Sequence, residues 1–216
     1  MMTYLNLVNG VLRRLREDEV SNVSESTYSK MVGDYVNDAK DLVETAWDWS
    51  PLRNTLTITT SNGDNLYSLT GSRNEGKVLN FINDTSNCLV EYQTQNWFDD
   101  KDFIQEAVTG SPKYFTYAGV DGSGDTQVKL YPTPDQAYTL KVRVVLRNVE
   151  LSADADTLAI PSSPVLHMAI ALLSRERGET GGTSTAEYFA IADKHLSDAI
   201  ALDAQKHPEE TIFYTP

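Results

Sequence analysis

The spacing of apolar residues changes twice along this chain of 216 residues, and these changes limit the folds it can adopt. Up to about residue 51, and again from about residue 160, apolar side chains recur every three or four positions, as in amphipathic helices. Between these segments they alternate with polar side chains, as in strands with one buried face. We therefore expect helices from both chain ends to flank a central β region.

Apolar stripes and capping residues indicate where the helices begin and end. Four helices are expected, over residues 4–16, 24–47, 163–178 and 184–204. Serines stand at the start of the last three, where a hydroxyl oxygen can accept a hydrogen bond from a first-turn N–H group. Trp47 and Trp49 follow the second helix and are expected to wedge its end against the next layer. Because most of these helices have one apolar side, they should pack as a bundle.

Turn residues divide the central region into candidate hairpins. The expected strand pairs are 54–60 with 66–69, 78–83 with 88–92, 114–118 with 127–131, and 127–131 with 138–147. In the last pair, Pro132 and Pro134 end the first strand because proline donates no ladder hydrogen bond. Residues 95–107 predict a short helix or an irregular arm. On the 138–147 strand, Leu140, Val142, Val144 and Leu146 should face the core, and Lys141, Arg143, Val145 and Arg147 the other side.

These patterns predict an α+β fold with three parts. Residues 1–51 and 160–205 are assigned to a helical bundle domain, residues 52–159 to an antiparallel β domain that is sandwich- or barrel-like, and residues 206–216 to an extended C-terminal arm. The arm contains Ile212, Phe213 and Tyr214 in a row, and leaving each such side chain in water costs about 1.5–3 kcal/mol. It should therefore dock on its own chain or reach a partner, for example by adding a strand to it.

Charge and cysteine content restrict the environment and the partners. The chain has a net charge of −13 and a single cysteine, Cys88, as expected in a reducing compartment. No apolar run is long enough for a membrane span, and the start lacks the layout of a signal peptide, so a soluble intracellular protein is expected. A chain this acidic is not expected to hold DNA tightly, although it could line a passage for DNA.

Motif searches assign no catalytic, cofactor-binding or metal-binding residues. Asp121, Ser123 and Asp125 have the spacing of the first ligands of a calcium loop, but Thr126 stands where that loop needs glycine and Pro132 where it needs glutamate. The glycine-containing stretch RGETGGTST lacks the lysine of a phosphate-binding loop. We therefore expect a protein without enzymatic activity, cofactor or metal ion.

Two other function classes remain open from the residues alone. A hydrolase could use His167 with Ser163 and Asp156, although no nucleophile elbow is present. A carbohydrate- or host-surface-binding module could use Trp97 and Phe98. In that module, the neighbouring Asp99 and Asp100 would supply the polar contacts.

Three segments together resemble the head–tail connector, or adaptor, proteins of tailed bacteriophages, including the tail-tubular adaptor of short-tailed phages. They are YSKMVGDYVNDAKDLVETAWDWSPL, VKLYPTPDQAYTLKVRVVLR and LAIPSSPVLHMAIALL with the helix that follows it. The resemblance implies a structural virion protein at the head–tail junction, assembled in the host cytoplasm. It also implies a homo-oligomeric ring, usually of twelve subunits, with DNA passing through its lumen without specific binding.

The same resemblance implies the partners of such a ring. It would dock on the portal protein and join a downstream tail protein, with tail fibres as a further possible partner. Ile212, Phe213 and Tyr214 are the expected portal contact. Lys141, Arg143 and Arg147 are the expected subunit interface, where they would face the acidic helical layer of a neighbour.

Overall fold

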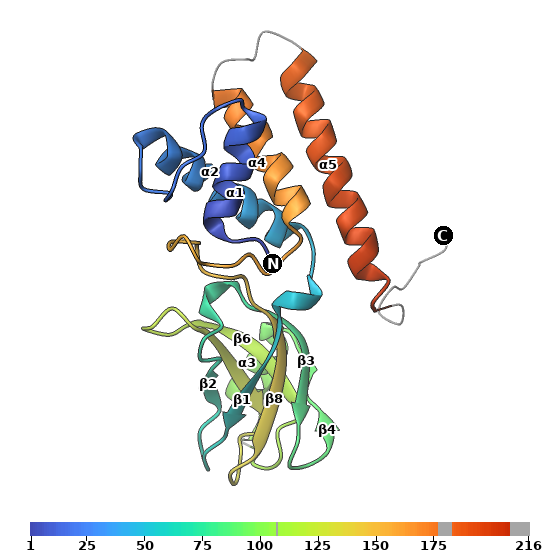
Figure 1. Cartoon of the computed structure of the whole chain (residues 1–216). Coiled ribbons are helices and arrows are strands. Elements are labelled where there is room, and N and C mark those ends of the chain that lie inside the picture. The colour runs from blue at the N-terminus through green and yellow to red at the C-terminus, as the bar shows by residue number, and fades with distance from the viewer. Residues whose placement is uncertain (107, 177–182, 208–216) are drawn as a thin grey trace, which may run out of the picture. The chain divides into compact units, whose positions relative to one another are not determined.

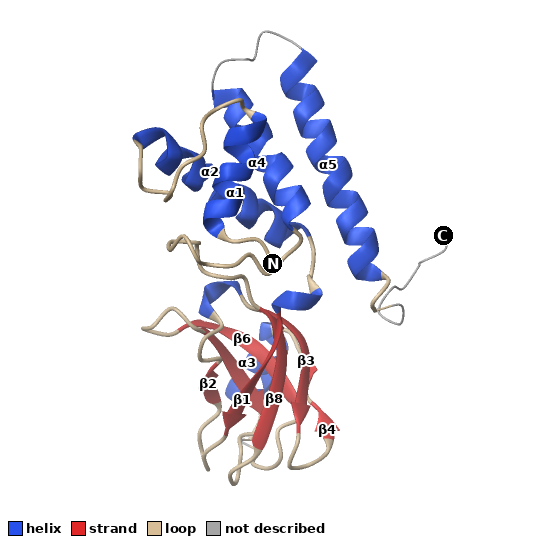
Figure 2. Cartoon of the chain, viewed as in Figure 1, coloured by secondary structure: helices blue, strands red, loops and turns tan. Residues whose placement is uncertain are grey.

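The computed structural model describes residues 1–106, 108–176 and 183–207 (Figure 1). The chain divides into two compact units, one formed by residues 1–52 with the chain from residue 147 onward, the other by residues 53–146. Helices build the first unit, and all the strands of the described chain lie in the second (Figure 2). The α+β fold class predicted from the periodicity is confirmed. None of the described helices has the length and apolar content to cross a membrane.

The helical unit is built around its fourth helix. Its elements are α1 (Tyr4–Arg14), α2 (Thr27–Ala46), the short 3-10 helix η1 (Ser50–Leu52), α4 (Ser162–Glu176) and α5 (Thr183–Ala204). Helix α4 packs against α1, α2 and α5, and nearly all of its residues from Pro164 to Ser174 are buried. A helix that is apolar around most of its circumference belongs in the middle of a bundle. Helices α2 and α5 bury one face each, whereas α1 buries every residue from Leu7 to Leu12.

An irregular segment after the last strand is bound along α2. The Asn37 side chain donates to the Leu151 carbonyl and accepts from the Leu151 N–H, both at 3.0 Å. One turn later, Lys40 Nζ donates to the Asn148 carbonyl at 3.1 Å. These bonds join the segment to the helical unit, and the compact units divide after Leu146, whereas the sequence pattern predicted a β domain up to residue 159. Residues 147–159 look like β-region sequence, but their backbone is held by helical side chains.

The second unit is a sandwich of two four-stranded sheets. One sheet has the order β1-β8-β3-β4 and the other β2-β7-β6-β5. The strands are β1 (Arg53–Thr59), β2 (Leu66–Ser68), β3 (Lys77–Asn83), β4 (Cys88–Leu89), β5 (Glu91–Tyr92), β6 (Tyr114–Val120), β7 (Thr126–Tyr131) and β8 (Thr139–Val145). A short 3-10 helix, η2 (Arg73–Glu75), and the helix α3 (Gln95–Phe103) complete the unit. All strand pairs are antiparallel except β5 with β6.

Two of the predicted hairpins are wrong and two have the predicted pairing at least in part. β6 pairs with β7, and β3 with β4, as expected, although the 88–92 segment then moves to the other sheet as β5. β1 pairs with β8 instead of β2, and β7 does not pair with β8. The turn at Pro132 and Pro134 carries the chain from one sheet to the other. Thr60 extends the pairing of β1 with β8 by one residue, because its hydroxyl accepts from the Tyr138 N–H at 2.8 Å and donates to the Gln136 carbonyl.

Alternating side chains from both sheets fill the space between them. The buried cluster consists of Ile58, Leu69, Phe81, Val90, Phe115, Val128, Leu130, Tyr138, Leu140, Val142 and Val144. The inward positions predicted for Leu140, Val142 and Val144 are therefore confirmed. Transfer of such side chains out of water, at about 1.5–3 kcal/mol each, is the main force holding the two sheets together.

Candidate interaction surfaces

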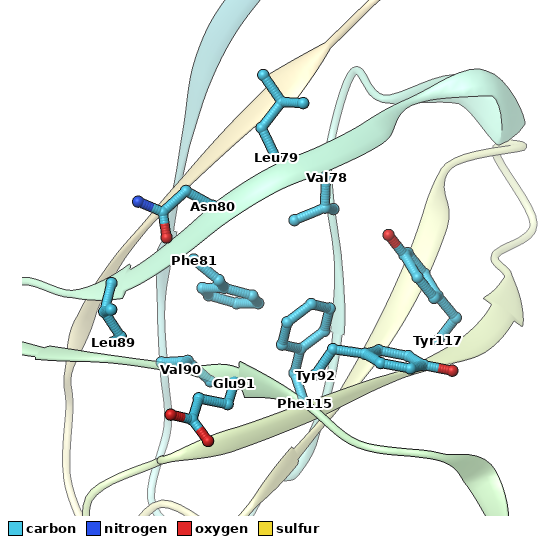
Figure 3. Close-up of a pocket in the computed structure, with 10 residues that line it drawn as sticks. All are labelled: Val78, Leu79, Asn80, Phe81, Leu89, Val90, Glu91, Tyr92, Phe115 and Tyr117. Carbon is cyan, nitrogen blue, oxygen red and sulfur yellow. The ribbon is translucent and has the colours of Figure 1, made fainter. Parts of the chain in front are cut away.

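A cavity of about 420 Å³ opens between the two sheets at one side of the sandwich (Figure 3). Aromatic rings form its floor: the Phe81 and Phe115 centroids lie 4.9 Å apart, and Tyr92 packs edge-on to Phe115 at 5.7 Å. Tyr117 stands at the mouth, where burial raises the pKa of its phenol and a hydrogen bond with the Val78 backbone opposes that rise. The lining residues come from β3, β4, β5 and β6 and the intervening Val90.

The two-residue strands β4 and β5 each pair with only part of the strand beside them at this cavity. β4 pairs only with Ile82 and Asn83 of β3, and the backbone of Val78 on the same strand is hydrogen-bonded with the Tyr117 phenol. In the other sheet, β5 pairs only with Tyr114 and Phe115 of β6, and no described strand runs along the outer edge of residues 116–120. Unpaired strand edges carry free ladder positions and readily accept a further strand.

A second hollow, of about 530 Å³, lies on the helical unit between α2 and α4. Leu42 and Leu172 supply apolar surface, and Leu42 is half exposed. Asp38 and Asp41 stand on the α2 side and Arg175 on the α4 side. The hollow therefore combines an apolar floor with charged margins, as in protein contact surfaces.

The predicted basic interface is only partly one surface. Lys141 and Arg143 are exposed on the same side of β8, as expected. Lys141 Nζ lies 3.0 Å from Asp84, and both side chains are about half exposed. Arg147 lies beyond the end of β8 and belongs to the helical unit, and Val145 is buried instead of facing outward. The alternation of buried and exposed side chains along β8 ends at Val145 because the chain leaves the sheet after this residue.

The end of α5 is bound to the end of α2 by one buried carboxylate. Asp203 accepts a hydrogen bond from the Ser50 N–H at 2.9 Å and another from Trp47 Nε1 at 3.3 Å. Lys206 Nζ lies 2.9 Å from the same side chain, and His207 Nε2 lies 3.0 Å from the Ser50 hydroxyl. The first two residues of the predicted arm thus contact the helical unit. The predicted portal contact, Ile212 to Tyr214, lies outside the described residues.

Asp203→Ala is expected to lower the free energy of unfolding by about 1–3 kcal/mol, because it removes a buried carboxylate and leaves the partly buried Ser50 N–H without its acceptor. Burial alone raises the pKa of Asp203, but the bonds from Lys206 and Ser50 outweigh it and hold the pKa below the ordinary value. The Asp203 carboxylate therefore makes its full contribution to the free energy of unfolding above about pH 4, and this contribution is lost as pH falls through the lowered pKa.

Urea unfolding of both proteins between pH 3 and 7 measures this difference. Asp198→Ala, which removes an exposed acid from the same helix, is the matched control and should change stability little. If Asp198→Ala and Asp203→Ala lower the free energy of unfolding equally, the role given to Asp203 is contradicted.

The histidines do not form the triad considered for a hydrolase. His167 and His195 stack with their ring centroids 4.0 Å apart, and Ser163 Oγ lies 3.1 Å from Nδ1 of His195, not of His167. Burial and the neighbouring His195 lower the pKa of His167. Asp156 accepts from the Ser152 and Ala153 N–H groups and so closes a turn. In the described contacts, no carboxylate bonds either histidine.

The aromatic pair considered for sugar binding anchors α3 to the sandwich. Phe98 is fully buried, so it offers no face to a ligand. The Trp97 ring packs against Tyr114 and Tyr131 with centroids 5.0 and 5.2 Å apart, and Lys101 Nζ lies over it at 5.3 Å. These contacts explain why two large aromatic side chains occur in so acidic a helix.

The acidic loop rejected as a calcium site is a backbone turn. Asp121 accepts from the Ser123 and Asp125 N–H groups, and Asp125 accepts from the Gly71 and Arg73 N–H groups, all within 3.0 Å. Within the described part of the chain, no group of three or more His, Cys, Asp or Glu side chains is placed to hold a metal ion.

Residues 2–209 match the family described as SU10 adaptor protein. The chain belongs to this family. A search of curated proteins finds no match. The resemblance to phage head–tail adaptors drawn from the three sequence segments is thereby confirmed.

An SU10 adaptor protein is a bacteriophage structural protein, so the family gives this chain the role of a virion component that contacts other virion proteins. The match covers both compact units, which means that the β sandwich is part of the adaptor and not an appended module. The cavity and the α2–α4 hollow were not predicted from the sequence. The residue pattern offered no signal for the cavity, because residues 88–92 were expected to form one strand and the structure divides them into β4 and β5.

Proposed function

We propose that this adaptor forms a homo-oligomeric ring, of twelve subunits as in the resembling connectors, that docks on the portal protein and joins it to the tail. The observation that carries this proposal is the family match over residues 2–209. DNA passes through the lumen without specific binding. The net charge of −13 supports this step, because an acidic wall repels the phosphate backbone.

The direct test mixes the purified chain with a purified portal ring and images the product by electron microscopy. The expected result is an added layer of density with the rotational symmetry of the ring, on the face of the portal where DNA leaves. A monomeric chain in isolation is compatible with the proposal, since subunits can assemble on the portal. A portal that stays bare at saturating chain concentration would contradict it.

We further propose that Lys141 and Arg143 lie at the interface between neighbouring subunits, facing an acidic helical surface of the next copy. Asp38 and Asp41 beside the α2–α4 hollow are candidates for that surface. Heterologous contacts of this kind join two different faces of identical subunits and close into a ring.

The double variant Lys141→Glu/Arg143→Glu is expected to fold normally but to weaken ring assembly on the portal. Folding is spared because the exposed ion pair of Lys141 with Asp84 is worth at most about 1 kcal/mol. Co-sedimentation with portal rings at low and at high salt measures the effect, and high salt should reduce the difference from the wild type. Lys113→Glu, an exposed lysine of the same unit, is the matched control. Equal weakening by the control would argue against a specific interface.

A further inference from the structure

We propose that the outer face of the sheet β1-β8-β3-β4 of one copy docks against the α2–α4 hollow of the neighbouring copy, with Ile82 and Leu89 placed beside Leu42. The inference rests on the proposed ring, because it needs an identical neighbour. It extends the interface of Lys141 and Arg143 from a contact between charges to an apolar contact whose occupant is a second copy of this chain.

The first support is an aliphatic patch beside the basic residues of β8. Lys141 is the ladder partner of Ile82 on β3, and Ile82 is also the partner of Leu89 on β4. Residues directly opposite each other in a sheet present their side chains on the same face. Ile82 is 37% exposed and Leu89 59%, whereas the β3 residues on either side of Ile82 are buried. The outer face of this sheet therefore combines aliphatic surface with positive charge.

The second support is apolar surface that the helical unit leaves in water. One face of α2 carries Tyr35, Leu42 and Ala46, at the spacing of a stripe that packs against another element. Leu42 is nevertheless 51% exposed. With Leu172 of α4, these residues line the hollow of about 530 Å³. Such a volume lies within the range of roughly 300–1,000 Å³ found for binding pockets, so it can take aliphatic side chains of a partner.

The third support is the complementary charge of the two surfaces. Asp38 and Asp41 stand on the α2 margin of the hollow, and Lys141 and Arg143 project from the outer side of β8. Since Asp41 and Lys141 are ion-paired within their own chain, Asp38 and Arg143 are the charges best placed to pair across the contact. Arg175 stands on the α4 margin, so the basic strand should lie on the α2 side. Complementary charges of this kind fix the register of two docked surfaces.

A crosslink tests the apolar part of the contact in full-length protein with a Cys88→Ser background, which removes the native thiol. One protein carries Ile82→Cys and the other Leu42→Cys. After mixing and mild oxidation in the presence of portal rings, the expected product is a disulfide-linked dimer with one chain of each kind, identified by mass spectrometry. In the control, Leu202→Cys replaces Leu42→Cys. Leu202 is more exposed than Leu42 but lies on α5 outside the hollow, so it should give little product.

A charge exchange tests the polar part of the contact. Arg143→Asp should weaken co-sedimentation with portal rings at low salt about tenfold, because it places like charges opposite each other. Adding Asp38→Arg to the same chain should restore most of the binding, since every interface then carries the pair in reversed order. Asp198→Arg, at an exposed acid of α5, replaces Asp38→Arg in the control and should restore nothing.

Three results would overturn the inference: equal crosslinking of Ile82→Cys to Leu42→Cys and to Leu202→Cys, crosslinking only within one chain when both cysteines are on it, or no recovery on adding Asp38→Arg. Rings that assemble on the portal without the crosslink or the recovery would refute this inference alone. Chains that crosslink as expected but never bind the portal would refute the proposed docking on the portal alone.

Discussion

Lys40→Met is expected to lower the free energy of unfolding at pH 7 by about 3–5 kcal/mol, because it leaves the buried Glu44 carboxylate without its oppositely charged partner. The Lys40 and Glu44 side chains are almost fully buried, with Nζ 3.6 Å from Oε2 of Glu44. Nζ also contacts Asp41 at 2.8 Å and the Asn148 carbonyl at 3.1 Å. Without the ammonium group, Glu44 keeps only its bonds with Asn148. Chemical denaturation followed by circular dichroism measures the loss.

The pH dependence identifies the cause of this loss. Burial raises the pKa of Glu44, while Lys40 and the Asn148 N–H oppose the rise. A carboxyl group with a raised pKa contributes its full stability below the ordinary value, near pH 4, and loses it as pH rises through the folded-state pKa. Removing Lys40 raises this pKa further, so the cost of Lys40→Met should be largest at neutral pH and shrink toward pH 4.

Two controls separate charge burial from loss of packing. The double variant Lys40→Met/Glu44→Leu should recover most of the lost stability, because it removes both charges together. Lys30→Met, at an exposed lysine of the same helix, should change stability little. A loss that is independent of pH and that persists in the double variant would contradict the account.

Trp49→Ala should also lower the free energy of unfolding by about 3–5 kcal/mol, because it opens a cavity at the end of α2. The Trp49 side chain is fully buried, and its Nε1 donates to the Val43 carbonyl at 2.7 Å. The alanine variant loses both the packing and the hydrogen bond. Thermal unfolding by calorimetry gives the size of the effect.

Trp49→Phe divides this effect into its two parts, since phenylalanine keeps most of the apolar volume but cannot donate to Val43. It should cost only about 1–3 kcal/mol. If phenylalanine proves as damaging as alanine, the hydrogen bond and not the packing fixes this end of the helix.

Predictions from the sequence were most accurate for features whose local residue pattern is compatible with a single structure. The stripe on α2 and the serine-led start of α4 placed both helices within a few residues of their observed bounds. The wedge expected of the two tryptophans matches the buried Trp49 and the bond from Trp47 to Asp203. The turn residues from Asp121 to Asp125 correctly indicated the hairpin of β6 and β7.

Strand partners were not predictable in the same way. A strand with one buried face shows the same alternation whether the next strand pairs beside it or crosses to the facing sheet. Pro132 ended β7 as expected, but nothing in the turn showed that the chain would change sheets. The ladder that pairs β1 with β8, including the bond from the Tyr138 N–H to Thr60, joins residues far apart in sequence.

The buried ion pair was missed for a related reason. Lysine and glutamate four positions apart normally indicate an exposed helix face. Here the segment from Asn148 to Leu151 covers that face and supplies the polar partners. Only the fold brings it there. The cavity likewise depends on two sheets whose facing edges cannot be inferred from one sequence.

Imaging of the intact phage particle tests the central claim most directly. The account predicts a ring of this chain at the vertex where the genome exits, between portal and tail, with the β sandwich and the helical unit both resolved in each subunit. A reconstruction of that vertex in which the chain forms no layer between portal and tail would contradict it.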